Sequence, residues 1–100
     1  MKTTIEEIDG NLIAIFEGRL DTAASAETEK ALAPLFGSEG KDIILDCSKL
    51  AYISSSGLRL FLTVLKSARP KGNKVYIQGM NDDLRTVFAM TGFTNLFNFK

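Results

Sequence analysis

The sequence predicts an α/β domain in which a mixed sheet of four to five strands packs against about three main helices. Short runs of apolar and β-branched residues at positions 11–17, 43–47 and 74–78 are typical of strands. Segments with helical spacing separate these runs, and two strands joined by a helix through short loops form a right-handed crossover and a parallel pair. A length of 100 residues fits a single domain over residues 1–100.

The amino-terminal third is predicted to be a hairpin followed by a helix. Strands at residues 3–8 and 11–17 flank an Asp-Gly dipeptide, which favours a tight hairpin turn. The helix is predicted over residues 23–36, and Pro34 predicts a kink or an early last turn because proline cannot donate a helical hydrogen bond. Residues 37–40 form a loop. The sequence leaves the N-cap of this helix open between Asp21, Thr22 and Ser25.

The centre of the chain is predicted to be a strand, a connector and an amphipathic helix. Residues 43–47 are almost continuously apolar, which indicates a strand buried on both faces. Residues 49–53 are a short connector, and the helix spans residues 55–69. Its apolar stripe follows helical spacing, with Arg59, Thr63 and Lys66 on the opposite side. The stripe consists of Leu58, Phe61, Leu62 and Leu65, widened by Leu60, Val64 and Ala68.

The last third adds a strand, a helix and a final short strand. Residues 74–78 form the strand, and Asn81 is placed to cap the helix that follows. Gly92 is a plausible end of this helix, and residues 96–99 form the last strand. Three residues of the helix are expected to face inward: Leu84, Val87 and Phe88.

The composition argues against several classes of function. Twelve basic and twelve acidic residues cancel, whereas a general nucleic-acid binder needs a basic excess. A single cysteine, Cys47, excludes an internal disulfide, and the absence of histidine removes the commonest zinc ligand and the commonest general base. Neither a signal-peptide core nor an apolar run of membrane-spanning length is found, so we expect a cytoplasmic protein without a membrane partner.

Two enzyme-like patterns do not hold. Residues 37–41 resemble a phosphate-binding loop, but the glycines are too close together and a strand follows instead of a helix. Ser55 or Ser56 as a nucleophile would need an activating base, and the chain has neither a histidine nor a Ser-x-x-Lys spacing that starts from these serines. We therefore expect no enzyme activity, no metal and no cofactor.

Three consecutive serines, Ser54, Ser55 and Ser56, precede Gly57 where the central helix is predicted to begin. Serine is a preferred N-cap residue, and the start of a helix carries a partial positive charge that favours phosphate. An exposed serine at this position is therefore suited to modification. Helix capping accounts for the same residues without any regulatory role, so the residues alone leave both interpretations open.

Four short motifs follow one another along the chain. They are Gly-Arg-Leu-Asp at residues 18–21, Ile-Leu-Asp at 44–46, Ile-Ser-Ser-Ser-Gly-Leu at 53–58 and Phe-Ala-Met-Thr-Gly-Phe at 88–93. In this order they resemble STAS domains, specifically bacterial anti-sigma factor antagonists, which carry Gly-x-Leu-Asp after the second strand and Asp-Ser-Ser-Gly or Asp-Ser-Thr-Gly before the central helix. The chain departs from that pattern at Ser54, where the family has Asp.

The resemblance implies a switchable binding protein. In this family the unmodified antagonist binds an anti-sigma factor, often a serine kinase, and thereby frees a sigma factor; phosphorylation separates the complex, and a phosphatase resets it. Ser55 matches the phosphorylated serine, with Ser56 and Ser54 as alternative acceptors. A phosphorylation-independent STAS interaction or ligand-sensing module is the alternative function. The expected partner-binding residues are Gly18, Arg19, Asp21, Ser54, Ser55, Ser56, Gly57, Arg59, Thr63 and Lys66.

Overall fold

A five-stranded mixed sheet forms the centre of the protein. In the computed structural model, which describes residues 1–37 and 40–99, the strands lie in the order of the sequence. The first two strands are antiparallel and the remaining pairs are parallel. Two residues of the loop predicted at 37–40, residues 38 and 39, lie outside the described residues. The strands are β1 (Lys2–Ile8), β2 (Asn11–Leu20), β3 (Ile43–Ile53), β4 (Val75–Gln78) and β5 (Asn98–Phe99).

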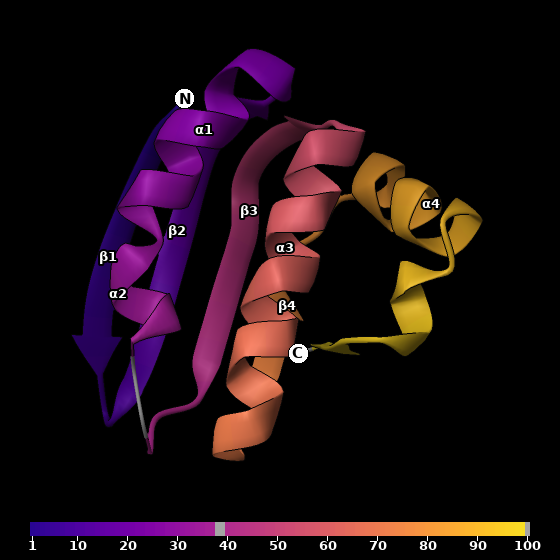
Figure 1. Ribbon diagram of the computed structural model, residues 1–100. Coiled ribbons are helices and arrows are strands. Elements are labelled where there is room, and N and C mark those ends of the chain that lie inside the picture. Colours follow the sequence, from indigo (N-terminus) through magenta and orange to yellow (C-terminus); the bar gives the residue numbers. More distant parts are fainter. Residues whose placement is uncertain (38–39, 100) are drawn as a thin grey trace.

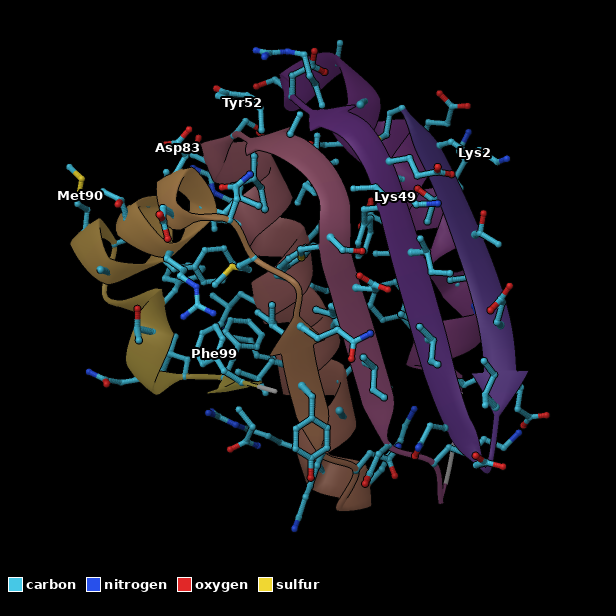
Figure 2. All side chains as sticks on the ribbon, turned by 180° about the vertical axis from the view of Figure 1, so that it is seen from behind. Lys2, Lys49, Tyr52, Asp83, Met90 and Phe99 are labelled. Atoms are coloured by element: carbon cyan, nitrogen blue, oxygen red, sulfur yellow. The ribbon has the colours of Figure 1, made fainter. Side chains whose placement is uncertain are left out.

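The helices cover one face of the sheet. Figure 1 shows α1, α2 and α3 in front of the strands, with α4 beside β4, and Figure 2 shows the opposite face of the sheet without a helix over it. This arrangement confirms the predicted α/β class with a mixed sheet. The helices are α1 (Thr22–Ala31), α2 (Ala33–Phe36), α3 (Ser55–Ala68) and α4 (Asp82–Met90), and short 3-10 turns follow α3 at Arg69–Lys71 and α4 at Phe93–Asn95.

The predicted hairpin is present, and its turn depends on left-handed backbone. Asp9 has a φ of 52° and Gly10 a φ of 79°, a combination that suits the twist of a two-residue hairpin. In β2 the side chains alternate, so that Leu12, Ala14 and Phe16 are buried beneath the helices. The hairpin thus contributes its inward-facing side chains to the core.

The helix predicted over residues 23–36 is in fact two helices. The chain leaves α1 at Leu32, whose φ of −85° and ψ of 0° end the regular helix, and α2 begins at the next residue. Pro34 lies in the first turn of α2, where its missing N–H group costs no hydrogen bond. The expected effect of the proline is confirmed, but the break lies two residues before it.

The connector predicted at residues 49–53 is wrong, because these residues continue β3. They pair in parallel with the end of β2, as in the register of Glu17 with Lys49 and of Leu20 with Ile53. The polar residues Ser48 and Lys49 lie exposed on the strand, while Leu50 remains buried. β3 therefore runs without interruption to the start of α3.

The strand core at residues 43–47 is buried, as predicted, although only one face lies under helices. Ile43, Leu45 and Cys47 belong to the main core beneath the helices. Ile44 points to the open face and is still only 6% exposed. Its register partners, Ile13 on β2 and Tyr76 on β4, flank it on that face.

The central and last helices bury the predicted stripes. In α3 six apolar residues are buried and Leu62 is half-buried. In α4 the side chain of Asn81 accepts a hydrogen bond from the N–H of Leu84 at 2.8 Å, and Gly92 follows the helix with a φ of 76°. Phe88 is fully buried. Its ring lies 6.1 to 6.4 Å from the rings of Phe61, Phe93, Phe97 and Phe99.

Phe88 is expected to anchor α4. Replacing it by alanine removes four ring contacts and leaves a cavity, so Phe88→Ala should lower the free energy of unfolding by about 3 to 5 kcal/mol. Met90→Ala on the same helix is the control, since Met90 is 81% exposed and its loss should change stability by less than about 0.5 kcal/mol. Urea titrations of both variants test this, and equal losses would contradict the role of Phe88.

Candidate functional site

The ends of β2 and β3 meet the start of α3 at one point. The C=O of Leu20 accepts a hydrogen bond from the N–H of Ser54 at 2.9 Å, and Leu20 is the register partner of Ile53. These interactions bring the segment at residues 18–21 beside the turn at residues 54–57. The two motifs, which lie more than thirty residues apart in the sequence, therefore share one end of the sheet.

Ser54 is the N-cap of α3. Its backbone is extended, with φ −87° and ψ 172°, and its Oγ accepts a hydrogen bond from the N–H of Gly57 at 3.2 Å. Its C=O accepts a second bond, from the N–H of Leu58 at 2.9 Å. With an exposed fraction of only 8%, Ser54 has a structural role and presents little of its hydroxyl to a second protein.

Ser55 is the accessible serine of the three. It is the first residue of α3 and is exposed, whereas Ser56 is half-buried. Backbone N–H groups without intrahelical partners lie in this first turn, which gives it a partial positive charge. A phosphate on the Ser55 hydroxyl is therefore electrostatically tolerated in the free domain.

Gly57 allows the helix to approach the strands closely. A Cβ atom at this position would lie 2.8 Å from Cγ1 of Ile53 and 2.8 Å from Cγ of Leu20. Both side chains are buried in the core, so they have little room to move away. The glycine thus fixes how α3 starts over the ends of β2 and β3, and with it the position of Ser55.

A cation and an aromatic ring lie beside this turn. The register of β2 and β3 shifts between Gly18 and Arg19, at a glycine with a φ of 101°, and Arg19 becomes the partner of Tyr52. The guanidinium carbon of Arg19 lies 4.3 Å from the centroid of the Tyr52 ring. Tyr52 is 40% exposed, and Figure 2 shows it at the end of the molecule where β3 finishes.

Tyr52 is not among the predicted site residues, because residues 49–53 were expected to form a connector. The strand continuation of β3 could have been recognised from the β-forming pair of Tyr52 and Ile53, which the polar residues before it concealed. Tyrosine and arginine are enriched among the residues that dominate binding at protein interfaces. The exposed pair is therefore an addition to the candidate site.

The remaining candidate residues occupy two places. Arg59, Thr63 and Lys66 are exposed on α3, and the Thr63 hydroxyl donates a hydrogen bond to the C=O of Arg59 at 2.8 Å. Asp21 is half-buried and caps α1, because its Oδ1 accepts from the N–H of Ala24 at 2.9 Å. This resolves the open choice of N-cap in favour of Asp21, and makes its carboxylate a structural group.

Two ionisable groups of β3 have shifted pKa values. Burial alone would raise the pKa of Asp46, but hydrogen bonds from Ser48 and Gln78 outweigh it and hold that pKa below its ordinary value. Burial, together with the negative charge of Asp46, raises the pKa of Cys47 to about 12. The thiol is therefore protonated at neutral pH, as is usual for an unreactive cysteine in a protein core.

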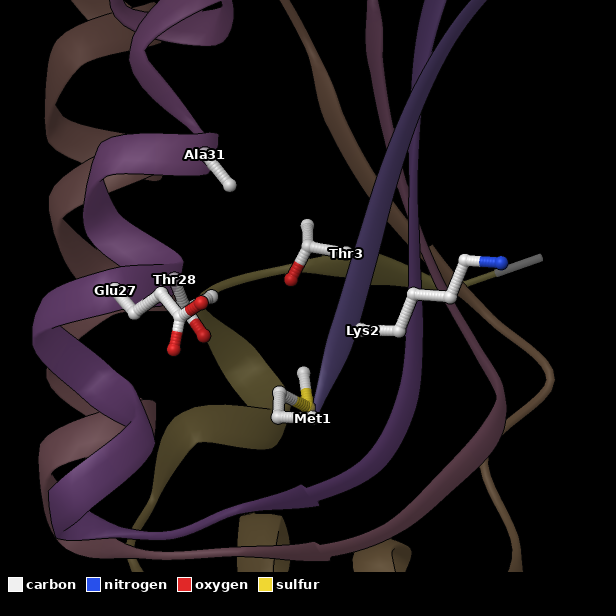
Figure 3. Close-up of a pocket in the computed structure, with 6 residues that line it drawn as sticks. All are labelled: Met1, Lys2, Thr3, Glu27, Thr28 and Ala31. Atoms are coloured by element: carbon white, nitrogen blue, oxygen red, sulfur yellow. The ribbon is translucent and has the colours of Figure 1, made fainter.

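A shallow pocket lies between the start of β1 and α1. It has a volume of about 260 Å³, and Figure 3 shows its lining side chains. This volume lies below the roughly 300 to 1,000 Å³ of typical small-molecule sites. Residues 1–37 and 40–99 bring together no group of three or more histidine, cysteine or carboxylate side chains that would suit a metal. None of their helices has the length and apolar character needed to cross a membrane.

The cap can be tested by a comparison of neighbouring serines. Ser54→Ala removes the acceptor for the Gly57 N–H group and should lower the free energy of unfolding by about 1 kcal/mol. Ser55→Ala is the matched control and should change it by less than about 0.5 kcal/mol, since its hydroxyl is exposed. Chemical denaturation of both proteins provides the measurement. A larger loss for Ser55→Ala would show that the roles of the two serines are reversed.

Comparison with known proteins places this geometry in a family. The model of the STAS domain matches residues 2–100. BtrV of Bordetella bronchiseptica, provisionally designated an anti-sigma factor antagonist, is 35% identical over 97% of this chain and 84% of its own length. An anti-sigma-B factor antagonist of Staphylococcus aureus is 31% identical over 81% of this chain and 75% of its own length.

Solved structures share the fold at lower identity. An anti-sigma factor antagonist from Mycobacterium paratuberculosis has a TM-score of 0.88 and 17% identity, over 98% of this chain and 83% of that one. The phosphorylated form of the Bacillus protein SpoIIAA has a TM-score of 0.75 and 17% identity, over 99% of this chain and 91% of that one. Family model, relatives and fold agree, and the protein belongs to the STAS domain family.

Proposed function

We propose that this protein is an anti-sigma factor antagonist, which binds an anti-sigma factor of the serine-kinase type and is switched off by phosphorylation of Ser55. Binding withdraws the anti-sigma factor and so frees a sigma factor for transcription. A phosphatase returns the protein to its binding form. The protein itself acts by binding and performs no catalysis in this scheme.

The observation that carries the proposal is the division of roles between two adjacent serines. Ser54 is buried and caps α3, whereas Ser55 is exposed on the first turn. The cap keeps the backbone fixed whether or not its neighbour is modified. The names of the relatives support the antagonist role, and the existence of a phosphorylated form of SpoIIAA, a protein of the same fold, supports the switch.

The switching reaction is a phosphoryl transfer. The Oγ–H bond of Ser55 breaks and an Oγ–P bond forms with the terminal phosphoryl group of ATP, while ADP leaves and the proton passes to a base of the kinase. Hydrolysis by the phosphatase replaces the Oγ–P bond with Oγ–H and releases inorganic phosphate. The Asp21 carboxylate, in the segment beside the turn, caps α1, so we assign the base to the partner.

The physical effect of the phosphate is local. It adds about 1.5 to 2 negative charges at neutral pH. In the free protein these charges lie in water at the positive end of α3. Inside an interface they lose that hydration, and each 1.4 kcal/mol of penalty lowers affinity about tenfold. The complex therefore separates without any change in the fold.

A capture experiment tests the proposal. Tagged wild-type protein and the variants Ser55→Asp and Ser55→Ala are used to capture proteins from the native cell lysate, and bound proteins are identified by mass spectrometry. Wild type and Ser55→Ala should retain an ATPase-type serine kinase, and Ser55→Asp should lose it with an affinity at least about tenfold lower. Purified kinase and ATP should phosphorylate wild type but leave Ser55→Ala unmodified.

Thr94→Asp is the matched control, because it adds the same charge at an exposed position after α4 and away from the start of α3. It should bind as wild type does. Retention of the same partner by wild type and Ser55→Asp would instead favour a phosphorylation-independent interaction module. If neither protein retains a kinase, the proposed function is wrong.

A further inference from the structure

We propose that the surface around Ser55 is a cationic docking site for an acidic segment of the partner protein, with Arg59 and Arg19 as its anchors. This inference rests on the proposed function and adds that the partner's contacting segment is acidic. It also gives the phosphate a second action: the phosphate competes with the partner's carboxylates for the same guanidinium groups. Three observations support this inference: the positive charge on the exposed face of α3, the stacking of Arg19 on Tyr52, and the four-residue spacing from Ser55 to Arg59.

The exposed face of α3 carries only positive charge. Ser55, Arg59, Thr63 and Lys66 follow one another at intervals of four, four and three residues, so they form one stripe along the helix. The stripe is about 16 Å long at 1.5 Å per residue. The helix contains no Asp or Glu, and two more basic residues follow it, in a protein whose net charge is zero.

Arg19 adds a positive charge at the end of β2, next to the residue that binds the Ser54 N–H group. Arg19 lies one residue before Leu20, whose C=O accepts a hydrogen bond from the Ser54 N–H group. The backbone of Arg19 therefore lies beside the same turn. Stacking on an aromatic ring orders the Arg19 guanidinium, whose N–H groups can donate to a carboxylate in the plane of the group. An ordered arginine on an exposed aromatic ring loses less entropy on binding than a free one.

Among the residues that the structure describes, these cations have no acidic partner. In residues 1–37 and 40–99, Arg19, Arg59 and Lys66 form no ion pair with a carboxylate. Asp21, the acidic residue of the nearby segment, already accepts the Ala24 N–H group as the cap of α1. Unpaired guanidinium groups around a docking site are complementary to carboxylates, and such charges set both the rate and the specificity of association.

The same charges explain how the phosphate competes. Ser55 and Arg59 are separated by four residues, the spacing at which an anion near the start of a helix pairs with a following cation. A phosphate on Ser55 can accept two hydrogen bonds from the Arg59 guanidinium. Phosphorylation then removes a cation from the docking site and places a dianion in its centre.

Charge reversal tests the partner's chemistry. Arg59→Glu and Arg19→Glu should each weaken binding of the captured kinase at least about tenfold in calorimetry, and Lys30→Glu less than about twofold. Lys30 is the matched control because it is exposed in the last turn of α1, away from Ser55. Wild-type affinity should fall when NaCl rises from about 0.05 to about 0.3 M. Circular dichroism confirms that each variant is folded.

The competing phosphate is tested without the partner. Phosphoserine incorporated at position 55 should shift the NMR signal of the Arg59 Nε–H group, and phosphoserine at position 94 should leave it unchanged. An unshifted Arg59 signal in the protein phosphorylated at Ser55 overturns the competition.

The outcomes separate the two proposals. If Ser55→Asp loses the kinase while Arg59→Glu and Arg19→Glu keep it, the acidic-partner inference is wrong and the proposed function stands. If Ser55→Asp keeps the kinase, the phosphorylation switch of the proposed function is wrong, whatever the charge-reversal variants show. Loss of binding to phosphatidylserine vesicles in Arg59→Glu, with kinase affinity unchanged, would assign the cationic surface to an anionic membrane and also overturn the inference.

Discussion

The close approach of α3 to the ends of β2 and β3 is the constraint on which the rest of the structure depends. A Cβ atom at Gly57 would lie 2.8 Å from the side chains of Ile53 and Leu20, so only glycine lets the helix begin this close to the strands. The Ser54 N–H group binds the C=O of Leu20, and its hydroxyl caps the helix. These short-range contacts fix a serine in an exposed position and bring two distant segments of the chain together.

A site of this kind separates stability from regulation. The Ser54 hydroxyl binds the backbone of its own helix, and Phe88 holds α4 through a cluster of aromatic rings. Neither depends on the state of the Ser55 hydroxyl. A charge added at Ser55 therefore alters what the surface binds, while the core that supports it stays as it is. A phosphate at Ser55 can therefore change binding without lowering the stability of the fold.

Much of the fold could be predicted from the sequence, because local signals and tertiary packing agree. The Asp-Gly turn, the Asn81 cap and the stripe of α3 each follow from residue chemistry, and the structure contains all three. The two wrong predictions, one continuous helix over residues 23–36 and a connector at residues 49–53, have physical causes. The break at Leu32 lies where the side chains of Leu32 and Leu35 are both buried, and the end of β3 is polar on its exposed side. The stacking of Arg19 on Tyr52 depends on a register shift that no local pattern reveals.

The central claim is that Ser55 is the phosphorylated residue. The most direct measurement is to incubate the protein with the captured kinase and ATP, digest it with trypsin, and locate the phosphate by fragment ions in the peptide of residues 50–59, which contains all three serines of the turn. The account predicts one phosphate, on Ser55. A phosphate on Ser54 or Ser56, or an unmodified peptide, would contradict it.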